Sequence, residues 1–133
     1  MTALGLMRSP GGWMAAAGAA LMLVNAFRAF HDPAAFAAYL GLPLAAPRDA
    51  ALIHVYALRA LFIGIAVAGL LVMRQRLALG VVAAAAVIMP AGDAILTHQA
   101  GAAMPTVLRH IGIAVFLAIA AIALARAAPT EPA

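Results

Sequence analysis

The chain has 133 residues, of which 68% are apolar and only 9% are charged, whereas a soluble domain carries roughly 25% charged residues. So few charges exclude a water-facing surface around any core, and the apolar excess must face lipid. The eight basic residues are scattered between apolar runs, which argues against a nucleic-acid partner despite a net charge of +4, and the lack of cysteine excludes disulfides and thiol redox chemistry.

The first predicted membrane span covers residues 13–31 and is stopped by Asp32-Pro33. It is longer than the roughly 7–15 residues of a signal-peptide core, so we expect an uncleaved helix. Residues 33–48 are too short and too rich in proline to cross a bilayer, for which a helix needs about 20 residues. We expect a brief interfacial helix there, followed by a turn.

The second and third spans are predicted at residues 50–73 and 77–97. Asp49 is the expected N-cap of the second span, because a side-chain oxygen at that position accepts from the first free N–H groups of a helix. Pro90 lies inside the third span and is expected to kink it, since proline cannot complete the helical hydrogen-bond ladder.

The fourth span is predicted at residues 105–126, with Pro105 as its first helical residue, and residues 127–133 are expected to be disordered. In order, these elements predict a single-domain, all-α fold: an integral membrane four-helix bundle with four transmembrane helices and a short interfacial helix between the first two. Small residues are expected to let the helices approach closely; they are Gly18, Gly64, Ala68, Gly80 and Gly112.

The placement of arginine predicts the orientation of the bundle. The N-terminus, the loop after the second span and the C-terminus carry Arg8, Arg74, Arg76 and Arg126, whereas Arg48 is the arginine clearly in a loop on the other side. Because cytoplasmic segments carry the excess of basic residues, we expect both termini in the cytoplasm and a location in the bacterial inner membrane.

Polar side chains gather in the half of the predicted bundle that lies away from the cytoplasm, while the cytoplasmic half of all four spans is nearly bare of them. They are Asn25, Arg28, His31, Asp32, His54, Tyr56, Arg59, Asp93, Thr97, His98, Arg109 and His110. Polar groups inside a membrane face the bundle interior or a hydrated cavity and often mark function.

Arg59 lies about ten residues into the second span, or roughly 15 Å from its start, near the middle of a hydrocarbon core about 30 Å thick. A charge there costs on the order of 3 kcal/mol or more unless it is paired or hydrated. We therefore expect Arg59 to point inward and to pair with Asp93, the one acidic residue inside an apolar run. Arg28 and Asp32 have the i, i+4 spacing of a second pair. The simplest assembly is a cavity open to the outer surface, with the Arg59–Asp93 pair at its floor and His110 beside it.

Each of these features also has a purely structural interpretation. The Arg59–Asp93 pair could only fix helix register, His110 could only hydrogen-bond a neighbouring helix, and Arg28 and Arg109 could extend to lipid headgroups. The four histidines have no tight ligand spacing such as HxxxH, so we expect no metal site. No motif indicates a cofactor.

An ordered series of single-residue anchors resembles a known family. The series is Asp32-Pro33, Gly41-Leu42-Pro43, Arg59 with Gly64 (RALFIG), Arg74-Gln75-Arg76, Gly80, Asp93 (PAGDAI), the loop HQAGAA and His110 (RHIG). It resembles the small four-helix membrane proteins of domain of unknown function family 4267 and, more distantly, DoxX-like proteins, some linked to quinone or sulfur redox. The resemblance implies a compact bundle and brings no established activity. The Arg-acidic pair typical of the family is broken, because Ala60 follows Arg59.

Two hypotheses of function follow. In the first, the chain binds or acts on a small lipophilic, isoprenoid- or quinone-like molecule; Arg59, Asp93 and His110 would be catalytic, with His110 as general acid or base. The ligand would be held by Asn25, Arg28, Tyr56 and Arg109. In the second, the chain is a non-catalytic membrane subunit or small transporter whose Arg-Asp-His cluster is structural. Apart from the bilayer, a homo-oligomeric partner is compatible with both.

Overall fold

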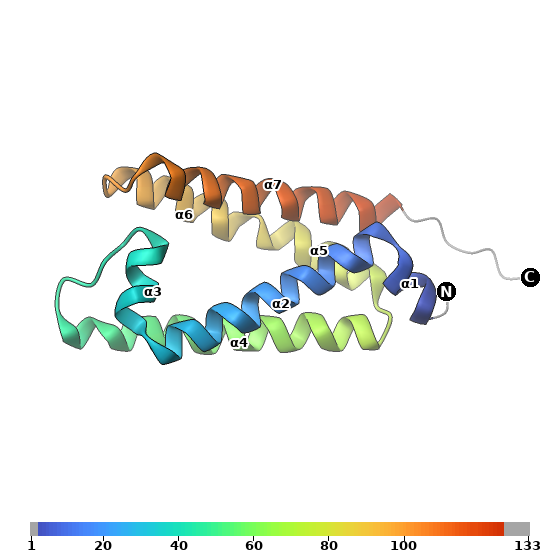
Figure 1. Ribbon diagram of the computed structural model, residues 1–133. Coiled ribbons are helices and arrows are strands. Elements are labelled where there is room, and N and C mark those ends of the chain that lie inside the picture. The colour runs from blue at the N-terminus through green and yellow to red at the C-terminus, as the bar shows by residue number, and fades with distance from the viewer. Residues whose placement is uncertain (1–2, 127–133) are drawn as a thin grey trace, which may run out of the picture.

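The computed structural model describes residues 3–126, which are entirely helical apart from short connections (Figure 1). The elements are α1 (Ala3–Arg8), α2 (Pro10–His31), α3 (Pro33–Leu40), the 3-10 turn η1 (Pro47–Asp49), α4 (Ala50–Val72), α5 (Arg76–Ala86), α6 (Ile88–Gln99) and α7 (Met104–Arg126). The expectation for residues 127–133 lies outside this range.

Four stretches within the described residues are long and apolar enough to cross a membrane: Pro10–His31, Pro47–Val72, Arg76–Gln99 and Met104–Arg126. They confirm the predicted all-α fold with four long apolar helices and suggest an integral membrane location. The short helix predicted between the first two spans is α3. Its position at a membrane interface stays a prediction.

Local hydrogen bonds explain where α2 and α3 begin. Ser9 caps α2 by accepting from the Gly12 N–H at 3.1 Å, and Asp32 caps α3 by accepting from the Ala35 N–H at 2.9 Å. The prediction that the Asp49 side chain caps the second span is wrong. Its carboxylate accepts from the Ala46 N–H at 2.9 Å and makes no side-chain cap to α4, because η1 folds it back onto the preceding turn.

The third span is interrupted, as Pro90 predicts, but the break lies one turn earlier. Helix α5 ends at Ala86 and α6 begins at Ile88, with Val87 in a turn between them. Pro90 has no N–H to donate to the carbonyl four residues before it, so the ladder fails at Ala86 rather than at the proline itself.

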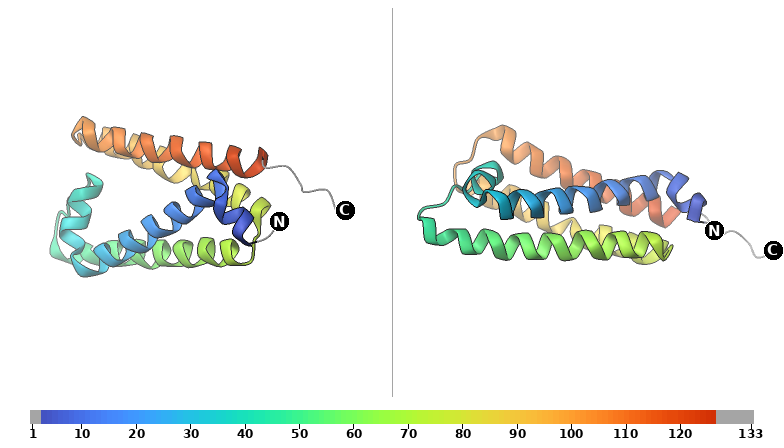
Figure 2. Two further views of the ribbon diagram at one scale, coloured as in Figure 1. Left: turned by 45° about the vertical axis from the view of Figure 1, so that its right-hand side comes forward. Right: turned by 60° about the horizontal axis from the view of Figure 1, so that its bottom comes forward.

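The helices form two layers that diverge from one end of the molecule. Helix α2 packs along α4, and α7 packs along α5 and α6. The layers meet near the two described chain ends, here called the terminal end, and lie apart at the opposite end, where α3 sits between them (Figures 1 and 2). We call this the α3 end.

Each end of the bundle has its own apolar cluster. Leu6, Leu71, Leu79 and Leu124 form one, and Ala29, Phe36 and Ala57 form the other, where α3 packs on α2 and α4. Gly64 allows α2 and α4 to approach closely, because a Cβ atom there would lie 2.8 Å from the Leu23 side chain. Gly18 and Gly112 face open space, so the expectation of close approach is wrong for those two.

Candidate functional site

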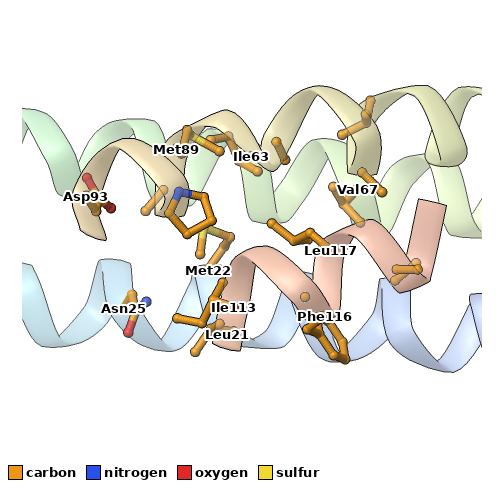
Figure 3. A pocket seen from close by; sticks show the side chains of 18 of the residues that line it. Leu21, Met22, Asn25, Ile63, Val67, Met89, Asp93, Ile113, Phe116 and Leu117 are labelled. Carbon is orange, nitrogen blue, oxygen red and sulfur yellow. The ribbon is translucent and has the colours of Figure 1, made fainter. Parts of the chain in front are cut away.

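A pocket of about 340 Å³ lies between the two layers, with walls from α2, α4, α5, α6 and α7 and the end of α3. Most of its lining is apolar. In Figure 3, Asp93 on α6 and Asn25 on α2 lie at one end of the pocket, while Ile63, Val67 and Leu117 lie deeper. The arrangement is that of a small-molecule site: apolar walls and a few convergent polar groups.

The structure brings the predicted site residues together along this one pocket, with the exception of Arg28. Those that line it are Asn25, Tyr56, Arg59, Asp93, Arg109 and His110. The remaining wall towards the terminal end is apolar, as predicted from the sequence. At the α3 end the cavity is also lined by Tyr39 and Leu40 of α3, while its opening to the outer surface stays a prediction.

His110 and Asp93 form the closest ion-pair contact in the pocket. The imidazole is almost completely buried, its Nδ1 lies 3.9 Å from Asp93 Oδ2, and the Asp93 side chain is 49% exposed and faces the pocket. His110 Nε2 lies 3.2 Å from the Leu40 carbonyl oxygen. A carbonyl can only accept, so Nε2 carries a proton and donates it. The other ring nitrogen, Nδ1, faces the Asp93 carboxylate.

The end of α3 is tied to α7 through two backbone carbonyls. Arg109 Nη2 donates to the Tyr39 carbonyl, and His110 donates to that of Leu40. The last carbonyls of a helix lack intrahelical partners and attract positive charge, and α3 is stopped at Gly41, which has a φ of +89°. Tyr39 was not predicted as a site residue. The available signal was its position two residues before Gly41, which ends α3.

Arg28 does not pair with Asp32, contrary to the prediction. Asp32 is used as the cap of α3, and the Arg28 guanidinium lies over the Tyr39 ring, 4.2 Å from its centroid. The Arg109 guanidinium lies 3.8 Å from the same centroid. Tyr39 therefore links α2, α3 and α7 through cation–π contacts, each worth about 0.5–2 kcal/mol depending on desolvation.

The predicted Arg59–Asp93 ion pair is also wrong. Among residues 3–126 the ion-pair partner of Asp93 is His110, and no acceptor from those residues lies within hydrogen-bond distance of Arg59. The physical reason is packing: α6 lies against α7, whereas α4 and α6 hardly touch. Arg59 lines the pocket and its side chain is exposed.

Asn25 lines the pocket and has a buried side-chain oxygen without a partner among the described residues. The residue is 7% exposed, and its Oδ1 has no hydrogen-bond partner within the described part of the chain. An unpaired buried carbonyl of this kind costs about 1–3 kcal/mol, which a bound hydroxyl or N–H group would recover. Within residues 3–126, no three His, Asp or Glu side chains gather in an arrangement that would hold a metal ion.

A family model described as a domain of unknown function (DUF4267) matches residues 19–124. The chain belongs to this family. The DUF4267 segment contains the six predicted site residues that line the pocket. It also contains both hydrogen bonds between α3 and α7. Neither a curated protein nor a solved structure shows significant similarity to the chain.

The structure gives physical roles to several anchors of the DUF4267 resemblance. Asp93 and His110 meet across the α6–α7 contact, Gly64 allows the α2–α4 approach, and Gly41 ends α3 so that its carbonyls reach α7. Arg59 lines the same pocket without a partner of its own from the described residues. These anchors therefore line a single cavity or hold together the helices around it.

Proposed function

We propose that this DUF4267 protein is a membrane-embedded binding protein or enzyme for one small lipophilic molecule. The observation that supports it is the 340 Å³ apolar pocket with converging polar groups at one end, a volume within the usual range for ligand sites. A cavity of about 150 Å³ admits benzene, so roughly twice that volume suits a molecule of about twelve to fifteen carbon atoms. An isoprenoid or a quinone head with a short tail has this size.

The polar end would orient the ligand and exchange a proton with it. Asn25 Oδ1 would accept from a ligand hydroxyl, and Asp93 would be the group that faces the ligand, because its side chain is half exposed while that of His110 is 5% exposed. His110 would act behind Asp93, replacing the proton that Asp93 donates to the ligand or taking up the one that Asp93 accepts from it. This revises the sequence-based assignment, in which His110 is the general acid or base.

The alternative is a non-catalytic subunit, and the hydrogen bonds between α7 and α3 favour it. Arg109 and His110 both donate to backbone carbonyls of α3, which is what a purely structural cluster would do. A non-catalytic subunit would, however, leave the apolar pocket and the unpaired Asn25 oxygen without a role. A transporter is less favoured still, because the pocket wall towards the terminal end offers no polar path.

Filling the pocket tests the proposal. Ile113 of α7 lines the cavity, and Val115 of the same helix is 52% exposed and does not line it. Thermal unfolding would be measured in neutral detergent with and without farnesol or menadione as probes. Ligand at about 100 times its Kd should stabilise the wild type by about 2.7 kcal/mol.

Ile113→Trp should abolish this stabilisation, and the matched control Val115→Trp should retain it. If Ile113→Trp responds to a bound probe as strongly as the wild type, the ligand does not occupy this pocket. If the wild type responds to neither of these probes nor to the aliphatic ones used below, the proposed function fails.

A further inference from the structure

The charges along the pocket do not balance. Besides its two tyrosines, its charged or titratable lining residues are Arg59, Asp93, Arg109 and His110. Asp93 is the one carboxylate among them, so the two guanidiniums face at most one negative charge and the pocket keeps a net positive charge whether or not His110 is protonated. A site of low dielectric that holds a net positive charge attracts an anion strongly.

The two guanidiniums are in different situations. Arg109 donates from Nη2 to the Tyr39 carbonyl and stacks on the Tyr39 ring, so one of its donors and its planar face are already used. Arg59 has no hydrogen bond, ion pair or ring contact with any of residues 3–126. It lies roughly 15 Å along α4 from the start of that helix, near mid-depth of the predicted bilayer, where an unpaired charge costs on the order of 3 kcal/mol or more.

Arg59 is also placed where a ligand can reach it. The side chain is exposed and lines the pocket on the side where α4 and α6 make little contact. Ile63 and Val67 follow one and two turns further along α4 and line the deeper wall. A molecule lying along α4 would meet the guanidinium with one end and the apolar wall with the rest.

We propose that the ligand is a single-chain lipophilic carboxylate whose head group pairs with Arg59 and whose apolar tail lies in the pocket. The inference rests on the proposed function, since it names the class of ligand for that cavity. A guanidinium binds a carboxylate through two parallel N–H donors. A volume of 340 Å³ suits one chain of about twelve carbons and not the two acyl chains of a phospholipid.

The test compares two probes that differ only in the head group. Dodecanoate and 1-dodecanol would be titrated at pH 7.5 into the purified full chain in neutral detergent, and their dissociation constants compared. The wild type should bind dodecanoate about tenfold more tightly than dodecanol, because only the carboxylate forms a charge-assisted pair. Arg59→Gln should bring the ratio to about one, and Arg59→Lys, which keeps the charge, should retain most of it.

The matched control is Arg48→Gln, which removes an exposed arginine of η1 that does not line the pocket; its ratio should equal that of the wild type. If the wild type binds both probes equally, the carboxylate inference is wrong while the proposed function stands. If neither these probes nor farnesol and menadione bind, both fail.

A second variant covers the case in which Arg59→Gln does not fold. Asp93→Asn removes the negative charge that faces the pocket, so the preference for dodecanoate over dodecanol should rise. An unchanged or lower ratio in Asp93→Asn would contradict an anionic head group beside it.

Discussion

Replacing His110 with alanine should loosen α3 from the rest of the bundle. The imidazole is 4% exposed and donates to the Leu40 carbonyl across the gap between α7 and α3. Hydrogen bonds between membrane helices contribute about 0.6 kcal/mol on average and up to about 1.7 kcal/mol. The lost ring adds a small cavity term. We therefore expect the free energy of opening α3 to fall by about 1–2 kcal/mol, a factor of about 5 to 30 in the opening equilibrium.

Thiol labelling measures this opening directly, because the chain contains no cysteine of its own. Ala37 of α3 is fully buried, so a cysteine introduced there should react with a membrane-permeable maleimide only when α3 separates. Labelling of Ala37→Cys should be about 5 to 30 times faster in the His110→Ala background. Ala38→Cys, at an exposed neighbouring position of α3, should react at the same rate in both backgrounds and serves as the control.

His110→Gln distinguishes the hydrogen bond from the volume of the ring. Its side-chain amide can still donate to the Leu40 carbonyl, so Ala37→Cys labelling should be slower than in His110→Ala. Equal labelling rates in the wild type and in His110→Ala would refute the reasoning, since the bond to Leu40 would then contribute nothing to the position of α3.

Three further predictions concern unfolding free energies in mixed micelles, measured by titration with a denaturing detergent. Arg59→Gln should leave the stability unchanged or raise it, because it removes an unpaired charge, whereas a buried ion pair with Asp93 would require a loss of about 3–5 kcal/mol. Gly64→Ala should lose about 1–3 kcal/mol through overpacking, while Gly69→Ala in the same helix, where a Cβ meets nothing within 4 Å, should lose nothing. Tyr39→Leu should lose about 1–4 kcal/mol with its two cation–π contacts, which Tyr39→Phe should retain; equal losses in the two would contradict this role.

The long helices could be predicted because composition left lipid as the only solvent for most of the chain. The predicted span 105–126 and the observed helix Met104–Arg126 differ by a single residue at one end. The first span begins at Pro10 rather than at Trp13, because Ser9 and Pro10 start the helix by capping chemistry that a search for apolar runs does not detect. The diverging layers were not predictable, since they depend on which helix faces pack.

The depth of each residue in its span and its helix face predicted which residues line the pocket. They did not predict which of these residues contact each other. Asn25, Asp93 and His110 were expected in one cavity and line one pocket. Coulombic reasoning on the sequence paired the deepest cation, Arg59, with the deepest anion. That pairing was wrong, because α6 packs on α7 and not on α4, so His110 and not Arg59 lies next to Asp93. Contacts to backbone carbonyls, such as those of α3, leave no sign in a list of charged residues.

The structural and the acid–base interpretations of His110 do not exclude each other. One ring nitrogen is used by the Leu40 carbonyl, which holds the ring in place and fixes its tautomer; the other faces Asp93. In the proposed function a proton would pass between His110 and the pocket through Asp93, or after α3 has separated. Loss of the Leu40 bond should thus disturb the chemistry as well as the fold, whereas Asp93→Asn should disturb proton exchange and leave α3 closed. Labelling of Ala37→Cys in the Asp93→Asn background separates the two: an accelerated rate there would mean that Asp93, too, is chiefly a structural partner.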